Sequence, residues 1–172
     1  MAELGIRKFN DLIGRRDLID FNGAEEHWKA HGLDLRKLIV NLEKEKDETF
    51  YNSKEQNHRL ELALDNELIS KSKKAISDKT KVNISSKIVN TNRTVGGMLS
   101  GVIAKKYGHN GLPKDTINID FTGNAGQSFG AWLSKGVNFN LKGDANDYVG
   151  KGLSGGRITV RPHETSKIIP EN

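Results

Sequence analysis

Two stretches of the chain align residue for residue, Ile117-Asn118-Ile119-Asp120-Phe121-Thr122-Gly123-Asn124-Ala125 and Val137-Asn138-Phe139-Asn140-Leu141-Lys142-Gly143-Asp144-Ala145. In both, apolar residues alternate with amide-bearing, acidic or basic residues, which is the pattern of a β-strand with one buried face. The two copies lie 20 residues apart. Repeats of this length are typical of stacked architectures, in which each unit buries its apolar face against its neighbours. The repeat therefore favours a scaffold over a catalytic domain.

Three glycine-rich stretches share a second part of the repeat, and they cover residues 92–101, 126–136 and 146–156. The last two contain short apolar runs, Ser128–Leu133 and Tyr148–Leu153, which we interpret as second strands. Glycine at the corners between runs permits sharp turns. Two strands and two glycine corners in about 20 residues predict a mainly β fold, a right-handed parallel β-helix. A β-hairpin meander is the alternative, because both arrangements use period two, but the register of like residues favours the parallel coil.

The two ends of the repeat depart from this pattern. The strand expected at Arg157-Ile158-Thr159-Val160 is one residue out of phase, and Gly155-Gly156 would absorb the slip, with Ile158 and Val160 pointing inward. The first copy, 92–101, fits either a unit of the β repeat or a helix, because apolar residues from Val95 to Tyr107 also recur at helical spacing. A helix there would cover one end of the stack.

The distribution of glycine divides the chain into two parts. Residues 1–80 hold four glycines and the remaining 92 residues hold fourteen. We therefore expect a helical and irregular connector over 1–80 and a glycine-repeat domain over 81–172. Ser53-Lys54-Glu55-Gln56 fits a capping box, and leucines at 60, 64 and 68 predict a helix from there to about Ile76. The first strand is expected at Val82-Asn83-Ile84.

Composition narrows the classes of function. The chain of 172 residues has no cysteine, which excludes disulfides, thiolate nucleophiles and cysteine-ligated iron–sulfur clusters within it. The net charge is +5, and six lysines lie between residues 71 and 87. No aromatic residue interleaves with them, so we expect a solvated helix end rather than a nucleic-acid site. No apolar segment is long enough for a membrane span or a signal peptide, which indicates a soluble, cytoplasmic protein.

Two motifs resemble ligand sites. Gly150-Lys151-Gly152-Leu153-Ser154-Gly155 spells the dinucleotide-binding pattern, but that pattern requires a following helix and this one leads into a strand. His27 and His31 have zinc-ligand spacing, yet Trp28 stands where the metalloprotease motif has glutamate. The histidines at 58, 109 and 163 have no partner pattern with an acid and a nucleophile. We therefore predict no catalytic, cofactor-binding or metal-binding residue in this chain.

Whole motifs of the chain resemble the C-terminal glycine-repeat (GXGXG) domain of the glutamate synthase large subunit. The motifs are Asn90-Thr91-Asn92-Arg93, Leu99-Ser100-Gly101, Gly126–Ala131 and the specific run Gly143–Gly156, and the N-terminal half adds Trp28–Asp34 and Leu64–Leu68. A domain of this kind also occurs in one subunit of formylmethanofuran dehydrogenase, but the N-terminal half favours glutamate synthase.

The resemblance implies a β-helix placed between a glutaminase domain and an FMN-binding barrel. The parent enzyme is an oxidoreductase that makes glutamate from glutamine and 2-oxoglutarate and channels ammonia between its sites. Its glutaminase nucleophile and iron–sulfur ligands are cysteines, which this chain lacks, and its FMN site matches no part of this chain. We therefore expect a fragment that is inactive alone, without FMN or iron–sulfur cluster, and that acts as an interdomain scaffold.

The expected partners are the other domains of glutamate synthase and its small reductase subunit, with no nucleic acid and no membrane. The family's domain continues with further coils, so we expect a truncated β-helix that self-associates or frays at its C-terminal coil. The alternative function is a free-standing β-helix module for protein interaction.

Overall fold

A computed structural model describes residues 1–20, 23, 26–34, 39 and 48–169 of the chain. It forms two compact units, Met1–Asn57 and His58–Asn172. The described part of the first unit contains short 3-10 helices, η1 (Phe9–Asp11), η2 (Arg16–Leu18) and η3 (Trp28–Ala30), none of which has a buried residue.

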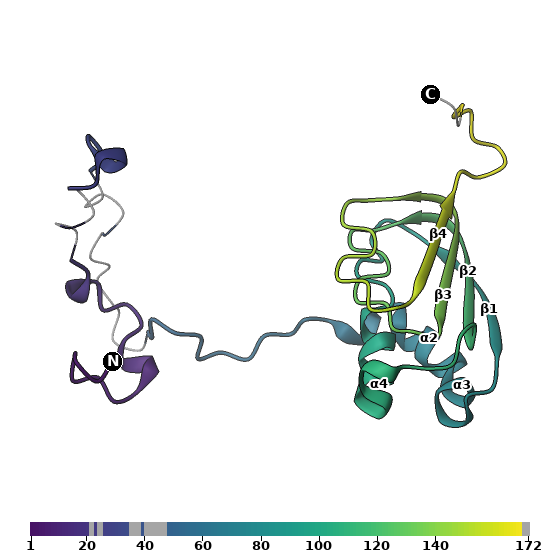
Figure 1. The fold of residues 1–172 in the computed structure, drawn as a ribbon, viewed down its shortest axis with the longest axis horizontal. Coiled ribbons are helices and arrows are strands. Elements are labelled where there is room, and N and C mark those ends of the chain that lie inside the picture. Colours follow the sequence, from purple (N-terminus) through teal and green to yellow (C-terminus); the bar gives the residue numbers. More distant parts are fainter. Residues whose placement is uncertain (21–22, 24–25, 35–38, 40–47, 170–172) are drawn as a thin grey trace. The chain divides into compact units, whose positions relative to one another are not determined.

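The second unit contains a four-stranded parallel sheet with the strand order β1-β2-β3-β4 (Figure 1). Its strands are β1 (Val82–Ile88), β2 (Ile117–Ala125), β3 (Val137–Ala145) and β4 (Arg157–Arg161). Its helices are η5 (Leu60–Leu62), α2 (Asp65–Lys71), α3 (Lys73–Asp78), α4 (Gly97–Tyr107) and η6 (Gly108–Asn110).

The sequence repeat sets the register of the sheet. Ile117 pairs with Val137, and each following residue of β2 pairs with the residue 20 positions later in β3. Between β3 and β4 the offset is 19, because Phe139 pairs with Ile158. The predicted parallel pairing of like residues and the predicted slip before β4 are both confirmed, as is the first strand at Val82.

The core lies between the sheet and the stacked turns that follow β2 and β3. Phe121 and Phe139 from the sheet meet Phe129 from a turn, with ring centroids 5.0 to 5.3 Å apart. All three rings are fully buried. Figure 1 shows the stacked turns across the core from the strands, with α2, α3 and α4 gathered at one end.

The prediction of a mainly β, right-handed β-helix is wrong. The described residues form one four-stranded sheet together with helices, and the runs expected as second strands form turns. In the first run Ser128, Gly130 and Trp132 have φ of 63°, 68° and 54°. In the second run the φ angles at 148, 150 and 152 are 64°, 65° and 62°. A left-handed residue at every second position is incompatible with an extended strand.

The hairpin meander is also excluded, because every pairing between the described strands is parallel. The first glycine-rich copy, residues 92–101, fits either a repeat unit or a helix by its sequence, and its second half forms the start of α4.

The helix predicted from the capping box begins later than expected. Ser53 accepts a hydrogen bond from the Thr49 hydroxyl at 2.9 Å, and no helix follows it until η5. The α-helix starts only at Asp65, and a break at Ser72 separates α2 from α3. Leu68 is fully buried, whereas Leu60 is exposed, so the helix forms where its apolar residues reach the core.

Candidate interaction face

One face of the sheet points away from the phenylalanine core and carries only polar side chains. Because successive residues of a strand point to opposite faces, each strand contributes every second residue. We call this the polar sheet face, and it consists of Asn83, Ser85, Lys87, Asn118, Asp120, Thr122, Asn124, Asn138, Asn140, Lys142, Asp144, Arg157, Thr159 and Arg161.

The register of the strands sorts twelve of these side chains into three rows that cross the sheet, and Asn124 and Asp144 pair beyond the third row. The first row holds Asn83, Asn118, Asn138 and Arg157. Asn138 Nδ2 donates to Asn118 Oδ1 and to Asp115 Oδ1, both at 2.7 Å, and Arg157 donates to the same Asp115 oxygen at 3.1 Å. These bonds tie three neighbouring strands and the preceding loop together, so this row is a structural ladder.

The middle row holds Ser85, Asp120, Asn140 and Thr159. Asn140 Nδ2 donates to Asp120 Oδ1 at 2.9 Å, and Asp120 supplies the only carboxylate of the three rows.

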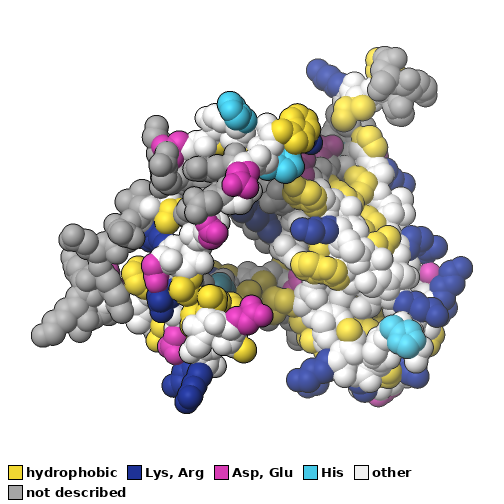
Figure 2. Space-filling model, turned by 60° about the vertical axis from the view of Figure 1, so that its left-hand side comes forward, with side chains coloured by type: hydrophobic (Ala, Val, Ile, Leu, Met, Phe, Trp, Pro, Cys, Tyr) yellow, Lys and Arg dark blue, Asp and Glu magenta, His cyan; other side chains and the backbone are white. Residues whose placement is uncertain are grey.

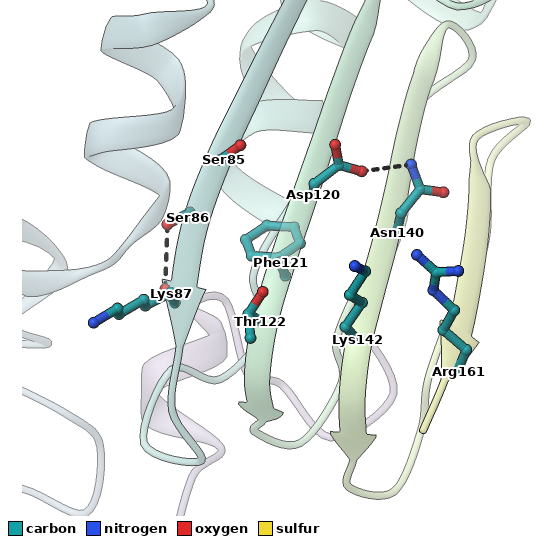
Figure 3. A pocket seen from close by; sticks show the side chains of 9 residues that line it. All are labelled: Ser85, Ser86, Lys87, Asp120, Phe121, Thr122, Asn140, Lys142 and Arg161. Carbon is teal, nitrogen blue, oxygen red and sulfur yellow. Dashed lines mark hydrogen bonds between the residues drawn. The ribbon is translucent and has the colours of Figure 1, made fainter. Parts of the chain in front are cut away.

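The third row, which we call the cationic row, holds Lys87, Thr122, Lys142 and Arg161. Figure 3 shows Lys142 and Arg161 on neighbouring strands, both standing beside Asn140, while the Lys87 side chain points to the side. Lys142 Nζ lies 3.2 Å from the Glu164 carboxylate, which comes from the segment after β4. The hydrogen bond and charge of Lys142, with smaller contributions from the charges of His163 and Arg161, lower the pKa of Glu164.

A hollow of about 650 Å³ lies over the middle and cationic rows (Figure 3). The side chains around it supply one carboxylate, three cationic groups, hydroxyls and an amide. These charged and polar groups can bind a polar or anionic group.

Asp65 is the buried ionisable residue that sequence reasoning missed. The residue is 3% exposed, and its carboxylate accepts hydrogen bonds from the amides of Gly96 at 3.0 Å and Leu99 at 2.9 Å. It therefore caps the N-terminus of α4 from a distant helix, which no local pattern reveals because 31 residues separate it from Gly96. Burial raises the pKa of Asp65, and the amide hydrogen bonds oppose that shift.

The stretch that resembles a dinucleotide-binding motif uses its amides within the stacked turns. The amide of Gly150 donates to the carbonyl of Phe129, and the amides of Ser154 and Gly156 donate to that of Leu133. The chain then continues into β4 rather than a helix. These amides are not available to hold a pyrophosphate.

His27 and His31 do not share a helix face. His27 precedes η3, where its Nδ1 accepts from the Lys29 amide at 3.2 Å, and His31 follows η3. Within the described ranges, no three histidine, cysteine, aspartate or glutamate residues gather in a way that could hold a metal ion.

The lysines of the lysine-rich stretch lie on α2, α3 and β1 and in the segment between α3 and β1, and Lys71 pairs with Glu67. Residues 58–172 carry 17 lysines and arginines against 10 aspartates and glutamates. Figure 2 shows lysine and arginine side chains scattered over the visible surface, with acidic side chains among them. None of the helices in the described part of the chain has the length and hydropathy of a membrane span.

Comparison with known proteins gives a family and a set of relatives. The family model described as the GXGXG motif matches residues 65–172, more than half of the chain. The large chain of an NADPH glutamate synthase from Bacillus subtilis is 46% identical over 95% of this chain and 11% of its own length. An NADH glutamate synthase from Schizosaccharomyces pombe is 42% identical over 99% of this chain and 8% of its own length. Ferredoxin-dependent glutamate synthase 2 from Synechocystis is 40% identical over 100% of this chain and 11% of its own length. The chain thus spans about a tenth of the length of these relatives.

Proposed function

Because this chain belongs to the GXGXG motif family, we propose that it is a structural interdomain scaffold of a glutamate synthase, the enzyme that makes glutamate from glutamine and 2-oxoglutarate by reductive amide transfer. The proposal rests on the share of each relative that this chain matches. Nearly the whole chain aligns with only a tenth of each large chain, so it corresponds to one region of a much longer enzyme.

The geometry of the second unit supports this role. Side chains of the sheet lie in the phenylalanine core on one face and in the polar rows on the other, and the turn amides bond to neighbouring turns. In this proposal residues 81–172 hold the two active regions of the enzyme at a working distance, and residues 1–80 connect them to the preceding barrel. The FMN and the iron–sulfur cluster belong to other domains.

A free-standing interaction module is the weaker proposal. It relied on a β-helix with a stacked docking face, and the described strands form a single four-stranded sheet. The coverage of the relatives favours a domain within a larger chain.

The test uses a full-length glutamate synthase large chain that contains this segment, with Gly143→Ala as the disrupting change. A Cβ at Gly143 would overlap the carbonyl oxygen of Gly123, and the φ of Gly143 is 145°. Gly101→Ala is the matched control, because no atom lies within 4 Å of the added Cβ. We expect Gly143→Ala to lower the amount of glutamate formed per glutamine hydrolysed, since a distorted scaffold would misplace the two active regions.

The same variant is expected to retain most of its ammonia-dependent glutamate synthesis, and Gly101→Ala to retain the normal ratio. A folded Gly143→Ala enzyme with an unchanged ratio, or with equal losses in every partial reaction, would contradict the scaffold role.

A further inference from the structure

All-parallel sheets are normally covered on both faces, yet most side chains of the polar sheet face are exposed. We propose that this face is a docking surface for an extended acidic segment of a partner polypeptide, whose carboxylates bind the cationic row. The inference rests on the scaffold role proposed above and names one surface through which a partner domain would be held.

The charge of the face determines the chemistry of this partner. The polar sheet face carries four cationic side chains, at positions 87, 142, 157 and 161, and two carboxylates, Asp120 and Asp144. Arg157 is already paired with Asp115. Among the described residues, Lys87 Nζ and the guanidinium of Arg161 have no hydrogen-bonded partner. A complementary surface therefore supplies negative charge along the cationic row.

The chain itself shows that a carboxylate fits this row. The side chain of Glu164, held in a turn where the Ser166 amide donates to the carbonyl of His163, places its carboxylate 3.2 Å from Lys142 Nζ. Glu164 is 81% exposed in this pair, and exposed ion pairs of this kind contribute little to stability. An incoming carboxylate can therefore displace Glu164 from Lys142.

The spacing of the strands favours an extended polypeptide over a single small anion. Neighbouring strands lie about 4.8 Å apart, so Lys87 and Lys142, two strands apart, are separated by about 10 Å along the row. That distance matches acidic residues at i and i+3 of an extended chain in the polyproline II conformation, which rises about 3.1 Å per residue and returns to the same face every third residue. One phosphate group is too small to bridge it.

Neighbouring groups restrict how such a segment lies. The Thr122 hydroxyl stands within the cationic row and can bond to the polar groups of an incoming chain. The Asp120 carboxylate occupies the adjacent row, where it would repel a second line of acids. The segment is therefore expected to cross the strands along the cationic row, with uncharged polar side chains toward Asp120.

The experiment titrates a blocked peptide, Thr-Glu-Thr-Thr-Glu-Thr, into the isotope-labelled 172-residue chain and follows amide resonances by NMR. We expect shifts at Thr122, Lys142 and Arg161, and weaker binding as salt rises. Lys142→Gln and Arg161→Gln should each weaken binding by about three- to tenfold, whereas Glu164→Gln should tighten it by about two- to fivefold because the internal competitor is lost.

Lys105→Gln, on α4, is the matched control for loss of one positive charge and should change binding by less than about twofold. Equal binding of the glutamine peptide Thr-Gln-Thr-Thr-Gln-Thr, or equal weakening by Lys105→Gln and Lys142→Gln, would overturn the proposal. Tighter binding of oligothymidylate at the same residues would also overturn it and assign the face to nucleic acid. Because the peptide experiment uses the isolated chain, its failure leaves the coupling test in the full-length enzyme unaffected.

Discussion

At the scale of single residues, the glycines of the repeat are explained by backbone conformation and close packing. Gly130 has a φ of 68°, and its amide donates to the carbonyl of Val95. A side chain there would overlap Cδ1 of Ile158 from β4. We expect Gly130→Val to lower the free energy of unfolding by about 2 to 4 kcal/mol, through backbone strain and this clash. Urea melts measure the loss, and curves that overlay those of the parent chain would disprove it.

Gly101 provides the control for this prediction. It lies within α4, its φ is not positive, and an added Cβ meets no atom within 4 Å. Gly101→Ala should therefore be neutral or stabilise the chain by up to about 1 kcal/mol, because alanine is the better helix former.

The raised pKa of Asp65 should make the stability of the chain depend on pH. Burial raises its pKa in the folded chain above the ordinary value of 3.8, so the folded state holds this proton more tightly than the unfolded state does. Its contribution to stability therefore falls as the pH rises from about 3.8 through the raised folded pKa, and is constant at higher pH. Asp65→Asn removes this titration.

We expect the stability of the parent chain relative to Asp65→Asn to decrease over that pH window, as measured by urea unfolding at a series of pH values. An increase instead would mean that the amides of Gly96 and Leu99 favour the ionised carboxylate more than burial opposes it.

At the scale of elements, the hydrogen-bonded asparagines of the first and middle rows should stabilise the sheet to different degrees. Asn138 is 5% exposed and donates to both Asn118 and Asp115, whereas Asn140 is less buried and donates to Asp120 alone. Asn138→Ala should cost about 1 to 3 kcal/mol because it removes two hydrogen bonds made by a buried side chain, and Asn140→Ala, which removes one exposed hydrogen bond, less than about 1 kcal/mol. Thermal or urea unfolding of the two variants tests the order, and a larger cost for Asn140→Ala would refute it.

The strands could be predicted from the sequence because their alternation is local and repeats. The pairing of Ile117 with Val137 follows from aligning the two copies. The turns were misjudged because Ser128–Leu133 contains β-favouring residues, while its conformation depends on hydrogen bonds to neighbouring turns, such as Gly130 to Val95. Nothing in the local pattern indicates that the backbone of Trp132 has a positive φ, since bulky residues rarely adopt that conformation.

The candidate face could be predicted only in part. Alternation identifies which residues of each strand point away from the core, and the repeat aligns Thr122 with Lys142. The slip before β4 brings Arg161 beside Lys142, and the contact of Glu164 with Lys142 depends on the path of the following segment. Asp65 as the cap of α4 is a tertiary contact between helices, beyond what spacing along the chain reveals.

At the scale of the whole molecule, β4 is one of the two outer strands of the described sheet and is the less buried of them. Its burial is lower than that of β2 and β3, and Val160 is 43% exposed although it pairs with Leu141. Large apolar side chains of the adjoining turn, Tyr148 and Leu153, are 62% and 48% exposed. An outer strand with exposed apolar neighbours is prone to pair or to fray.

We therefore expect the isolated chain to associate with a second copy at this end, and β4 to exchange its amide hydrogens faster than β3. An antiparallel pair of β4 strands would place Arg157 opposite Arg161, and like charges in that position repel. Association through the apolar side chains should consequently strengthen as salt screens the arginines. Light scattering at rising protein and salt concentrations measures association, and hydrogen exchange measures fraying.

Val160→Lys should abolish this association, because a lysine on an outer strand opposes pairing. Val102→Lys is the matched control, since Val102 of α4 is exposed to a similar degree, 39%, and belongs to a helix rather than to the outer strand. A strict monomer at high concentration, with slow exchange from Ile158 to Val160, would show that β4 is protected by the chain itself. Equal effects of the two lysines would indicate nonspecific association of apolar surface, because only pairing at β4 distinguishes the two positions.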